Sequence, residues 1–168
     1  MLIRRLLSKS VAEAATEFPV IAIMGPRQSG KTTMAQSSFP HHRYISLEDH
    51  DIKIRAETDP RLFLTEYPSE AGLIIDEIQH APQLLSYMQT IVDRDKKNGF
   101  FVVTGSQNFL VDKAITQTLA GRMAVVTLLP LSIRELAEAE LLPAKMDTLL
   151  YKGSYPKIHA TTTSIERL

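Results

Sequence analysis

The sequence predicts an α/β fold in which a five-stranded parallel sheet lies between two layers of helices. Short apolar segments alternate with segments of helical spacing through the 168 residues. This alternation favours parallel strands joined by right-handed helical crossovers. The stretch GPRQSGKT, residues 25–32, follows the first apolar segment and precedes a helical one. In such folds, ligands bind at the carboxyl ends of the strands.

Runs of apolar and β-branched residues mark the expected strands, and continuous apolar runs are typical of strands buried on both faces. The second strand, RYISL, alternates instead and is followed by acidic residues. The expected strands are residues 19–24, 43–47, 73–75, 100–104 and 123–128.

Apolar residues at helical spacing predict the helices that connect these strands. In the third helical region, Asp59 is placed to cap a helix that has Pro60 in its first turn. Ser132 and Glu135 have the spacing of a capping box at the start of the last clear helix. The expected helices are an amphipathic helix over 2–18, one from 33 to 38, two short helices within 52–67, then 82–97, 107–119 and the one capped by Ser132.

The loop after the first strand fits the phosphate-binding pattern G-x-x-x-x-G-K-[ST] without exception. Its backbone N–H groups and the following helix start would face phosphate oxygens. Lys31 would reach the β- and γ-phosphates, Thr32 would bind Mg²⁺, and Thr33 would place a hydroxyl near the α-phosphate. We therefore expect a bound nucleoside triphosphate. The loop residues are Gly25, Pro26, Arg27, Gln28, Ser29, Gly30, Lys31 and Thr32.

The third strand ends in two acids, Asp76 and Glu77, which is the Walker B pattern. Asp76 would hold Mg²⁺, directly or through water. Glu77 would polarise a water aimed at the γ-phosphate. The second acid favours a P-loop NTPase of the additional-strand, catalytic-glutamate type over a small-molecule kinase. In that type, strand 100–104 lies between the first and third strands, and the predicted sheet order is 5-1-4-3-2.

Small polar residues follow the fourth strand in the stretch Thr104-Gly105-Ser106-Gln107. If this strand lies between the first and the third, these groups lie beside the γ-phosphate. Ser106 is then the candidate γ-phosphate sensor, with Thr104 or Gln107 as substitutes. The alternative is an ordinary turn of small polar residues at a strand end.

Arg122 precedes the fifth strand and follows Gly121. A guanidinium suits the charge that develops on a transferred phosphoryl group. Arg122 would act within its own chain or on a neighbouring subunit of a homo-oligomer. The alternative is that Gly121 ends a helix and Arg122 caps its carbonyl groups.

The overall composition excludes several classes of protein. The chain has no cysteine, which excludes disulfides and thiol nucleophiles and suits the cytoplasm. Its formal net charge is zero, so charge gives no support for a nucleic-acid partner. No apolar run approaches the length of a transmembrane helix, and we expect no membrane partner.

Seven stretches together resemble one prokaryotic family of AAA-like P-loop ATPases, the AAA_14 type, whose core is usually followed by a DUF4143 domain. They are GPRQSGKTT, YISLEDHD, DPRLFL, LIIDEIQHAPQLLSYMQTIVD, FVVTGSQNFL, LAGRMAVVTLLPLSIREL and KGSYPKIH. The resemblance implies a cytoplasmic ATPase that uses ATP and Mg²⁺. It assigns Gly30, Lys31 and Thr32 to the nucleotide and Mg²⁺, and Asp76 and Glu77 to the Walker B pair. It also matches positions of less certain role, which are Gln79, Ser106, Gln107 and Arg122.

The same resemblance predicts two parts of the chain. Residues 1–142 would form the ATPase core with its N-terminal amphipathic helix, and residues 143–168 would begin a truncated C-terminal region. Three alternatives to an ATPase coupled to conformational change remain open. They are a nucleotide-binding module with little turnover, a small-molecule phosphotransferase, and a DNA-linked ATPase by family analogy.

Overall fold

The computed structural model describes residues 3–67, 70–106 and 119–160. Its centre is a five-stranded parallel sheet in the order β2-β3-β4-β1-β5. This is the predicted order read from the opposite edge, with β4 inserted between β1 and β3. The strands are β1 Val20–Met24, β2 Arg43–Ser46, β3 Leu73–Asp76, β4 Phe101–Gly105 and β5 Met123–Thr127.

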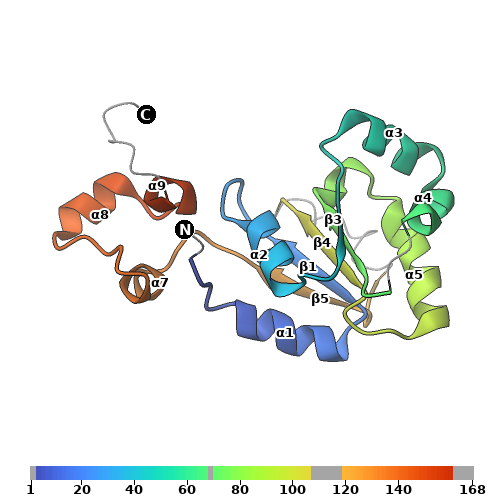
Figure 1. The fold of residues 1–168 in the computed structure, drawn as a ribbon, viewed down its shortest axis with the longest axis horizontal. Helices are drawn as coiled ribbons and strands as arrows, with labels where there is room; N and C mark the ends of the chain where they lie inside the picture. Colours follow the sequence, from blue (N-terminus) through green and yellow to red (C-terminus); the bar gives the residue numbers. More distant parts are fainter. Residues whose placement is uncertain (1–2, 68–69, 107–118, 161–168) are drawn as a thin grey trace.

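Helices cover both faces of the sheet, which confirms the predicted three layers (Figure 1). Val11 of α1 and Met34 of α2 pack on one face against Ile21 and Ile23 of β1. Helices α3, α4 and α5 cover the other face. The helices of these layers are α1 Ser8–Glu17, α2 Lys31–Ser38, α3 His50–Thr58, α4 Pro60–Glu66 and α5 Leu84–Asp95.

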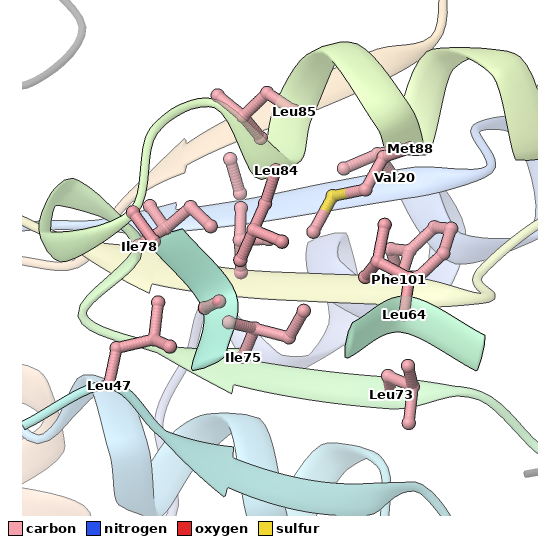
Figure 2. Close-up of a cluster of buried hydrophobic side chains, with 14 of the residues drawn as sticks. Val20, Leu47, Leu64, Leu73, Ile75, Ile78, Leu84, Leu85, Met88 and Phe101 are labelled. Atoms are coloured by element: carbon pink, nitrogen blue, oxygen red, sulfur yellow. The ribbon is translucent and has the colours of Figure 1, made fainter. Parts of the chain in front are cut away.

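The larger part of the core lies between α5 and the sheet (Figure 2). Leu84 and Met88 of α5 pack with Val20 of β1 and Phe101 of β4. Every residue of β1 is buried, as expected for a central strand with helices on both sides. Close packing on both faces leaves little freedom to the strand ends that carry the predicted site.

Local capping signals are confirmed in this fold. The Asp59 carboxylate accepts a hydrogen bond from the Leu62 N–H at 2.9 Å, and Pro60 is the first residue of α4. Ser132 and Glu135 form the predicted capping box. Such caps form between residues three positions apart in the sequence, so they can be predicted without knowledge of the tertiary contacts.

Two predicted helices are shorter than expected. The first begins at Ser8 rather than residue 2, because the side chain of Arg5 is drawn into contacts with the loop after β1 and with a later helix. Helix α5 covers 84–95 rather than 82–97, and Lys96 ends it with a left-handed φ of 48°. Of the helix predicted over 107–119, residues 107–118 lie outside the described residues.

The last three helices form a small group beside the sheet, next to the N-terminus (Figure 1). Leu131, Leu136 and Leu149 form its own buried cluster, against which Ile3 packs. This cluster crosses the boundary predicted at residue 142. We call the group the C-terminal helical group, which is α7 Ile133–Glu138, α8 Met146–Lys152 and α9 Pro156–Ala160.

Among the described residues, no helix combines the length and the apolar character that a membrane crossing requires.

Candidate nucleotide-binding site

The loop between β1 and α2 has the backbone of an anion-binding nest. Gln28 and Gly30 both have left-handed φ angles, 63° and 93°, and Gly30 directly precedes α2. Alternation of this kind turns successive N–H groups toward one point, and the start of α2 adds its positive dipole end. The loop therefore fits a phosphate group.

Gly25 opens this loop in a place where no side chain fits. A Cβ atom added there would lie 2.1 Å from the Leu128 carbonyl oxygen. Leu128 in turn donates its N–H to the Met24 carbonyl at 2.7 Å, so its backbone is fixed to the end of β1. The glycine allows the loop to leave the sheet in contact with the end of β5.

We predict that Gly25→Ala lowers the free energy of unfolding by about 1–3 kcal/mol and weakens ATP binding, because the added methyl group pushes the loop away from Leu128. Gly121→Ala is the control, because nothing lies within 4 Å of its Cβ position and only its φ of 74° is strained. Thermal unfolding and titration with a fluorescent ATP analogue measure the two effects. Equal ATP affinity in Gly25→Ala and wild type would contradict this role.

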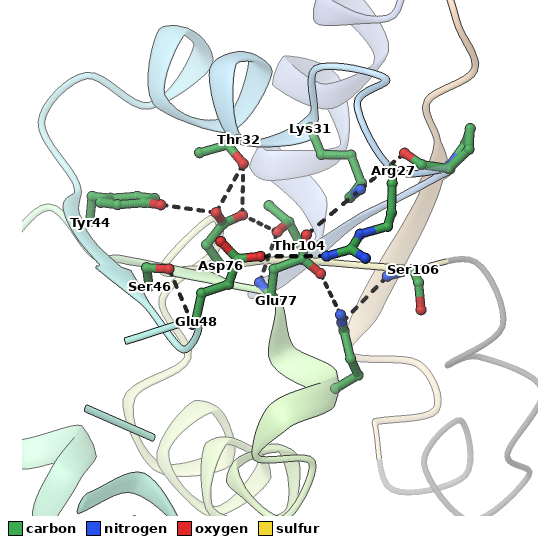
Figure 3. A network of polar contacts seen from close by, with 12 residues as sticks. Arg27, Lys31, Thr32, Tyr44, Ser46, Glu48, Asp76, Glu77, Thr104 and Ser106 are labelled. Atoms are coloured by element: carbon green, nitrogen blue, oxygen red, sulfur yellow. Dashed lines mark hydrogen bonds and ion pairs between the residues drawn. The ribbon is translucent and has the colours of Figure 1, made fainter. Parts of the chain in front are cut away.

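Asp76, at the end of β3, accepts hydrogen bonds from three hydroxyl groups (Figure 3). Thr32 of α2 lies 3.1 and 2.9 Å from its two carboxylate oxygens. The Tyr44 hydroxyl of β2 donates at 2.9 Å, and the Thr104 hydroxyl of β4 donates from the other side. Three neighbouring elements thus hold one carboxylate at the carboxyl edge of the sheet.

The charge of this carboxylate bears on whether Mg²⁺ fits. Asp76 is only 5% exposed, and no cationic side chain among the described residues forms an ion pair with it. A buried carboxylate is normally stabilised by a paired cation or a metal. Thr32 and Asp76 supply the hard oxygen donors that Mg²⁺ takes, usually one or two from protein together with water and phosphate oxygens. The two residues fit this ion.

Glu77 directly follows Asp76 but has a left-handed backbone conformation. Its φ of 58° is left-handed, and its N–H donates to the Thr104 hydroxyl at 3.1 Å. Its carboxylate lies 3.9 Å from the Lys31 ammonium and accepts a hydrogen bond from the Gln79 amide. The structure therefore brings Glu77 and Lys31 together, as the sequence predicts, and adds Gln79 as a partner of Glu77.

Lys31 is buried at the first position of α2, where it is 5% exposed. Its ammonium donates to the Pro26 carbonyl at 3.1 Å, so it folds back over the loop. Arg27, by contrast, is 88% exposed and forms an ion pair with Glu48 at 4.0 Å. Within the loop, the side chains of Lys31 and Thr32 are held at the site, and Arg27 lies on the surface.

The Tyr44 hydroxyl is less acidic than an ordinary tyrosine hydroxyl. Burial, the hydrogen bond to Asp76 and the negative charge of Asp76 together raise the pKa of Tyr44 to about 12. The ordinary pKa of tyrosine is about 10. Because the folded pKa is the higher one, the protonated hydroxyl contributes stability that is complete below about pH 10 and is lost as pH rises toward 12.

We predict that Tyr44→Phe lowers the free energy of unfolding at neutral pH by about 0.5–1.5 kcal/mol, the net value of one hydrogen bond. The wild type should lose this advantage between about pH 10 and 12. Tyr87→Phe is the matched control, because Tyr87 is similarly exposed, at 40%. Urea unfolding over this pH range measures both. An advantage that persists unchanged at the highest pH would contradict the assignment.

Ser106 lies near Glu77 but has a different contact from the one predicted for a sensor. Its backbone N–H points to the Gln79 amide oxygen at 3.4 Å. Thr104, its named substitute, is fully buried and is already engaged with Asp76 and Glu77. Gln107 lies outside the described residues. A sensor role for Ser106 stays a prediction.

Arg122 lies at the amino ends of the strands, whereas the phosphate loop lies at their carboxyl ends. It precedes Met123, which pairs with Val20 at the amino end of β1, whereas the loop follows the carboxyl end. Its guanidinium pairs with Asp93 of α5, at 2.5 Å and 3.0 Å, and donates to the Ala120 carbonyl. This placement does not support action on the same chain's loop, so a catalytic role remains a prediction only for a neighbouring subunit. The bond to the Ala120 carbonyl agrees with the alternative that Arg122 caps carbonyl groups next to Gly121.

A cavity of about 690 Å³ extends from the loop toward the C-terminal helical group. Its size is in the range of small-molecule and cofactor pockets. Lys31, Thr32, Thr33 and Glu77 are among its lining residues. Residues that the sequence did not assign to the site also line it, among them Ile3, Ser8, Ala12, Leu131, Pro156 and Lys157.

Comparison with known proteins gives three kinds of match. A family model described as an AAA domain matches residues 17–137. Two uncharacterized proteins, from Mycobacterium bovis and Mycobacterium tuberculosis, are each 30% identical over 157 residues, which is 91% of this chain and 33% of each relative. The chain thus spans about a third of the length of these curated relatives.

Solved structures share the fold at low sequence identity. DnaA of Aquifex aeolicus, solved with AMPPCP bound, is similar with a TM-score of 0.58 and 16% identity, over 92% of this chain and 57% of its own. A signal transduction ATPase with numerous domains from Pyrococcus horikoshii has a TM-score of 0.60 at 16% identity, over 98% and 31%. A Walker-type ATPase of Pyrococcus abyssi has a TM-score of 0.58 at 16% identity, over 92% and 65%.

Proposed function

The chain belongs to the AAA domain family and has a P-loop ATPase fold, and from this premise we propose that it binds ATP with Mg²⁺ and hydrolyses the γ-phosphate bond. The observation that carries the proposal is the meeting of Lys31, Thr32, Asp76 and Glu77 at one edge of the sheet. These are the four groups that phosphate binding, metal binding and activation of water require.

Each group has a separate task in this proposal. The N–H groups of the loop and the Lys31 ammonium hold the β- and γ-phosphates and balance their charge. Thr32 and Asp76 would hold Mg²⁺, which would act as a Lewis acid and neutralise charge on the phosphate oxygens. The Tyr44 and Thr104 hydroxyls orient the Asp76 carboxylate for this task.

Glu77 acts as the base. Its carboxylate takes a proton from a water as the water oxygen bonds to the γ-phosphorus and the bond from that phosphorus to the bridging oxygen breaks. ADP leaves with that oxygen, and inorganic phosphate is released. Gln79 limits the freedom of Glu77 before the reaction, because its amide donates to the Glu77 carboxylate.

The test is Mg²⁺-dependent phosphate release from ATP, measured over a range of protein concentrations. We expect turnover in wild type and none above background in Lys31→Ala. Lys53→Ala is the matched control, because Lys53 pairs with Glu57 on the surface of α3. Wild-type turnover that is absent, or is the same in Lys31→Ala, would contradict the proposal.

The concentration series also tests Arg122. Because Arg122 lies at the amino edge of the sheet, its proposed catalytic role requires a second subunit. Turnover per molecule should then rise with protein concentration, and Arg122→Ala should remove the rise. Turnover per molecule that is independent of concentration would contradict a shared arginine.

A further inference from the structure

Arg5 is a buried arginine that connects three separate segments of the chain. It is 9% exposed, and each part of its guanidinium has a partner. Nη1 donates to the Ser29 carbonyl of the phosphate loop at 2.8 Å, and Nη2 donates to the Leu129 carbonyl, after β5, at 2.6 Å. Nε donates to the Glu135 carboxylate of α7 at 2.9 Å.

Glu135 gathers further donors at the same point. It accepts the Leu6 N–H at 2.9 Å and both the N–H and the hydroxyl of Ser132, at 2.8 and 3.1 Å. Burial alone would raise the pKa of Glu135, but the N–H groups of Ser132 and Leu6 together with Arg5 outweigh it and hold the pKa below its ordinary value. The carboxylate is therefore charged at neutral pH, as a partner of Arg5 should be.

The Arg5 contact with the loop occurs where the loop takes its shape. Ser29 lies between Gln28 and Gly30, the two residues with left-handed φ angles. Arg5 Nη1 also lies 3.6 Å from the place where a Cβ atom of Gly30 would be. A planar guanidinium offers donors in a fixed fork, so it holds the Ser29 carbonyl in one direction relative to its other two partners.

Four acceptors of this chain hold the guanidinium of Arg5: the Glu135 carboxylate and the carbonyls of Ser29, Leu129 and Pro130, the last at 3.5 Å. Because these contacts fix its orientation, we expect Arg5 to act on the nucleotide through the loop. The cavity supports this view, because Arg5, Leu131 and Pro156 line it together with the loop residues Gly30 and Lys31. Loop, N-terminal segment and C-terminal helical group therefore surround the same space.

We propose that Arg5, held by Glu135, is a positioning residue that fixes the phosphate loop and couples nucleotide binding to the packing of the C-terminal helical group. The proposal rests on the proposed function only in requiring ATP at the loop. Coupling of this kind is reciprocal: if helix α7 stabilises the loop that binds ATP, ATP stabilises helix α7. Residues 133–160 then respond to ATP although none of them belongs to the loop.

The experiment combines ATP affinity with hydrogen exchange of residues 133–160. In wild type, ATP with Mg²⁺ should slow exchange in α7 and α9. Arg5→Met keeps the length of the side chain but loses its hydrogen bonds, and it should raise the ATP dissociation constant at least about tenfold and remove the slowing. Glu135→Gln should do the same more weakly, since it keeps an acceptor oxygen but loses the charge.

The control substitutions are on helix α7, which also carries Glu135. Arg134→Met and Glu138→Gln remove an exposed pair, with Arg134 Nε and a Glu138 oxygen 2.8 Å apart, that does not contact the loop. Both should bind ATP as wild type does and keep the slowing of exchange. A loss of helix packing alone would speed exchange in Arg5→Met without ATP but would leave an ATP-dependent difference, so that difference separates positioning from stability.

The outcomes are distinguishable. Wild-type affinity in Arg5→Met and Glu135→Gln, or wild-type binding without any change in exchange of residues 133–160, would overturn the coupling alone. No ATP binding by the wild-type chain would overturn both the coupling and the proposed function. If Arg5→Met does not fold, as circular dichroism would show, the Glu135→Gln variant and its Glu138→Gln control decide the matter.

Discussion

Glu77→Gln is expected to lower ATP turnover at least about 100-fold while ATP binding remains near the wild-type value. Removal of a general base typically costs a factor of about 10²–10⁴. The amide has the shape of the carboxylate, so it keeps the place set by the φ of 58° and by the Thr104 hydroxyl. It cannot take a proton from water, and it brings one negative charge less to the phosphates.

Single-turnover hydrolysis and equilibrium ATP binding, measured on the same preparation, separate the two effects. Glu48→Gln is the matched control, because Glu48 is 60% exposed and pairs with the exposed Arg27 at 4.0 Å. It should leave both values unchanged. A turnover of Glu77→Gln equal to that of wild type would exclude Glu77 as the base.

Asp76→Asn is expected to lower Mg²⁺-dependent turnover at least about 100-fold, with little loss of stability. The variant keeps the side-chain volume but loses the charge that holds the metal. In the metal-free protein that charge is buried with hydroxyl partners and forms no ion pair within residues 3–67, 70–106 and 119–160, so its removal relieves a cost. The free energy of unfolding should therefore change by less than about 1 kcal/mol.

Urea unfolding without nucleotide and Mg²⁺ titration of ATP hydrolysis measure these effects. Asp95→Asn serves as control, because its carboxylate is 43% exposed and pairs with the adjacent Arg94. Activity should be that of wild type in the control. Full Mg²⁺-dependent activity in Asp76→Asn would show that Asp76 does not hold the metal.

The fold could be predicted from the sequence because its signals are local. Each strand except β2 is a run of apolar and β-branched residues, and the Ser132–Glu135 capping box needs only residues three apart. The sheet order followed from one chemical detail, the second acid after β3, which favours a class with β4 inserted. The pairing of Thr32, which follows β1, with Asp76 of β3 then follows, because parallel strands have their carboxyl ends on the same side of the sheet.

The contacts of Arg5 could not be predicted, because it meets Glu135 across 130 residues of sequence and no local pattern marks the pair. Helical spacing of apolar residues even placed Arg5 inside the first helix. Tyr44 was missed for a different reason. The alternating pattern of β2 predicts a strand but assigns no function to Tyr44. The register of β2 on β3, with Ser46 opposite Asp76, brings the Tyr44 hydroxyl to the Asp76 carboxylate.

The position of Arg122 could have been inferred from the sequence. The predicted strand 123–128 starts just after it, and the amino ends of parallel strands lie at the edge opposite to the phosphate loop. The ion pair with Asp93 also lowers the pKa of the Asp93 carboxyl, as expected for a surface contact that belongs to the fold.

Equilibrium binding of ATP, with Mg²⁺ present, to wild type and to Lys31→Ala tests the central claim most directly. The account predicts saturable binding of one ATP per wild-type chain, displaced by ADP, and binding at least about 100-fold weaker in Lys31→Ala. The Lys53→Ala control should bind as wild type does. No saturable binding to wild type, or equal binding to Lys31→Ala, would contradict the claim that the loop of residues 25–32 is a nucleotide site.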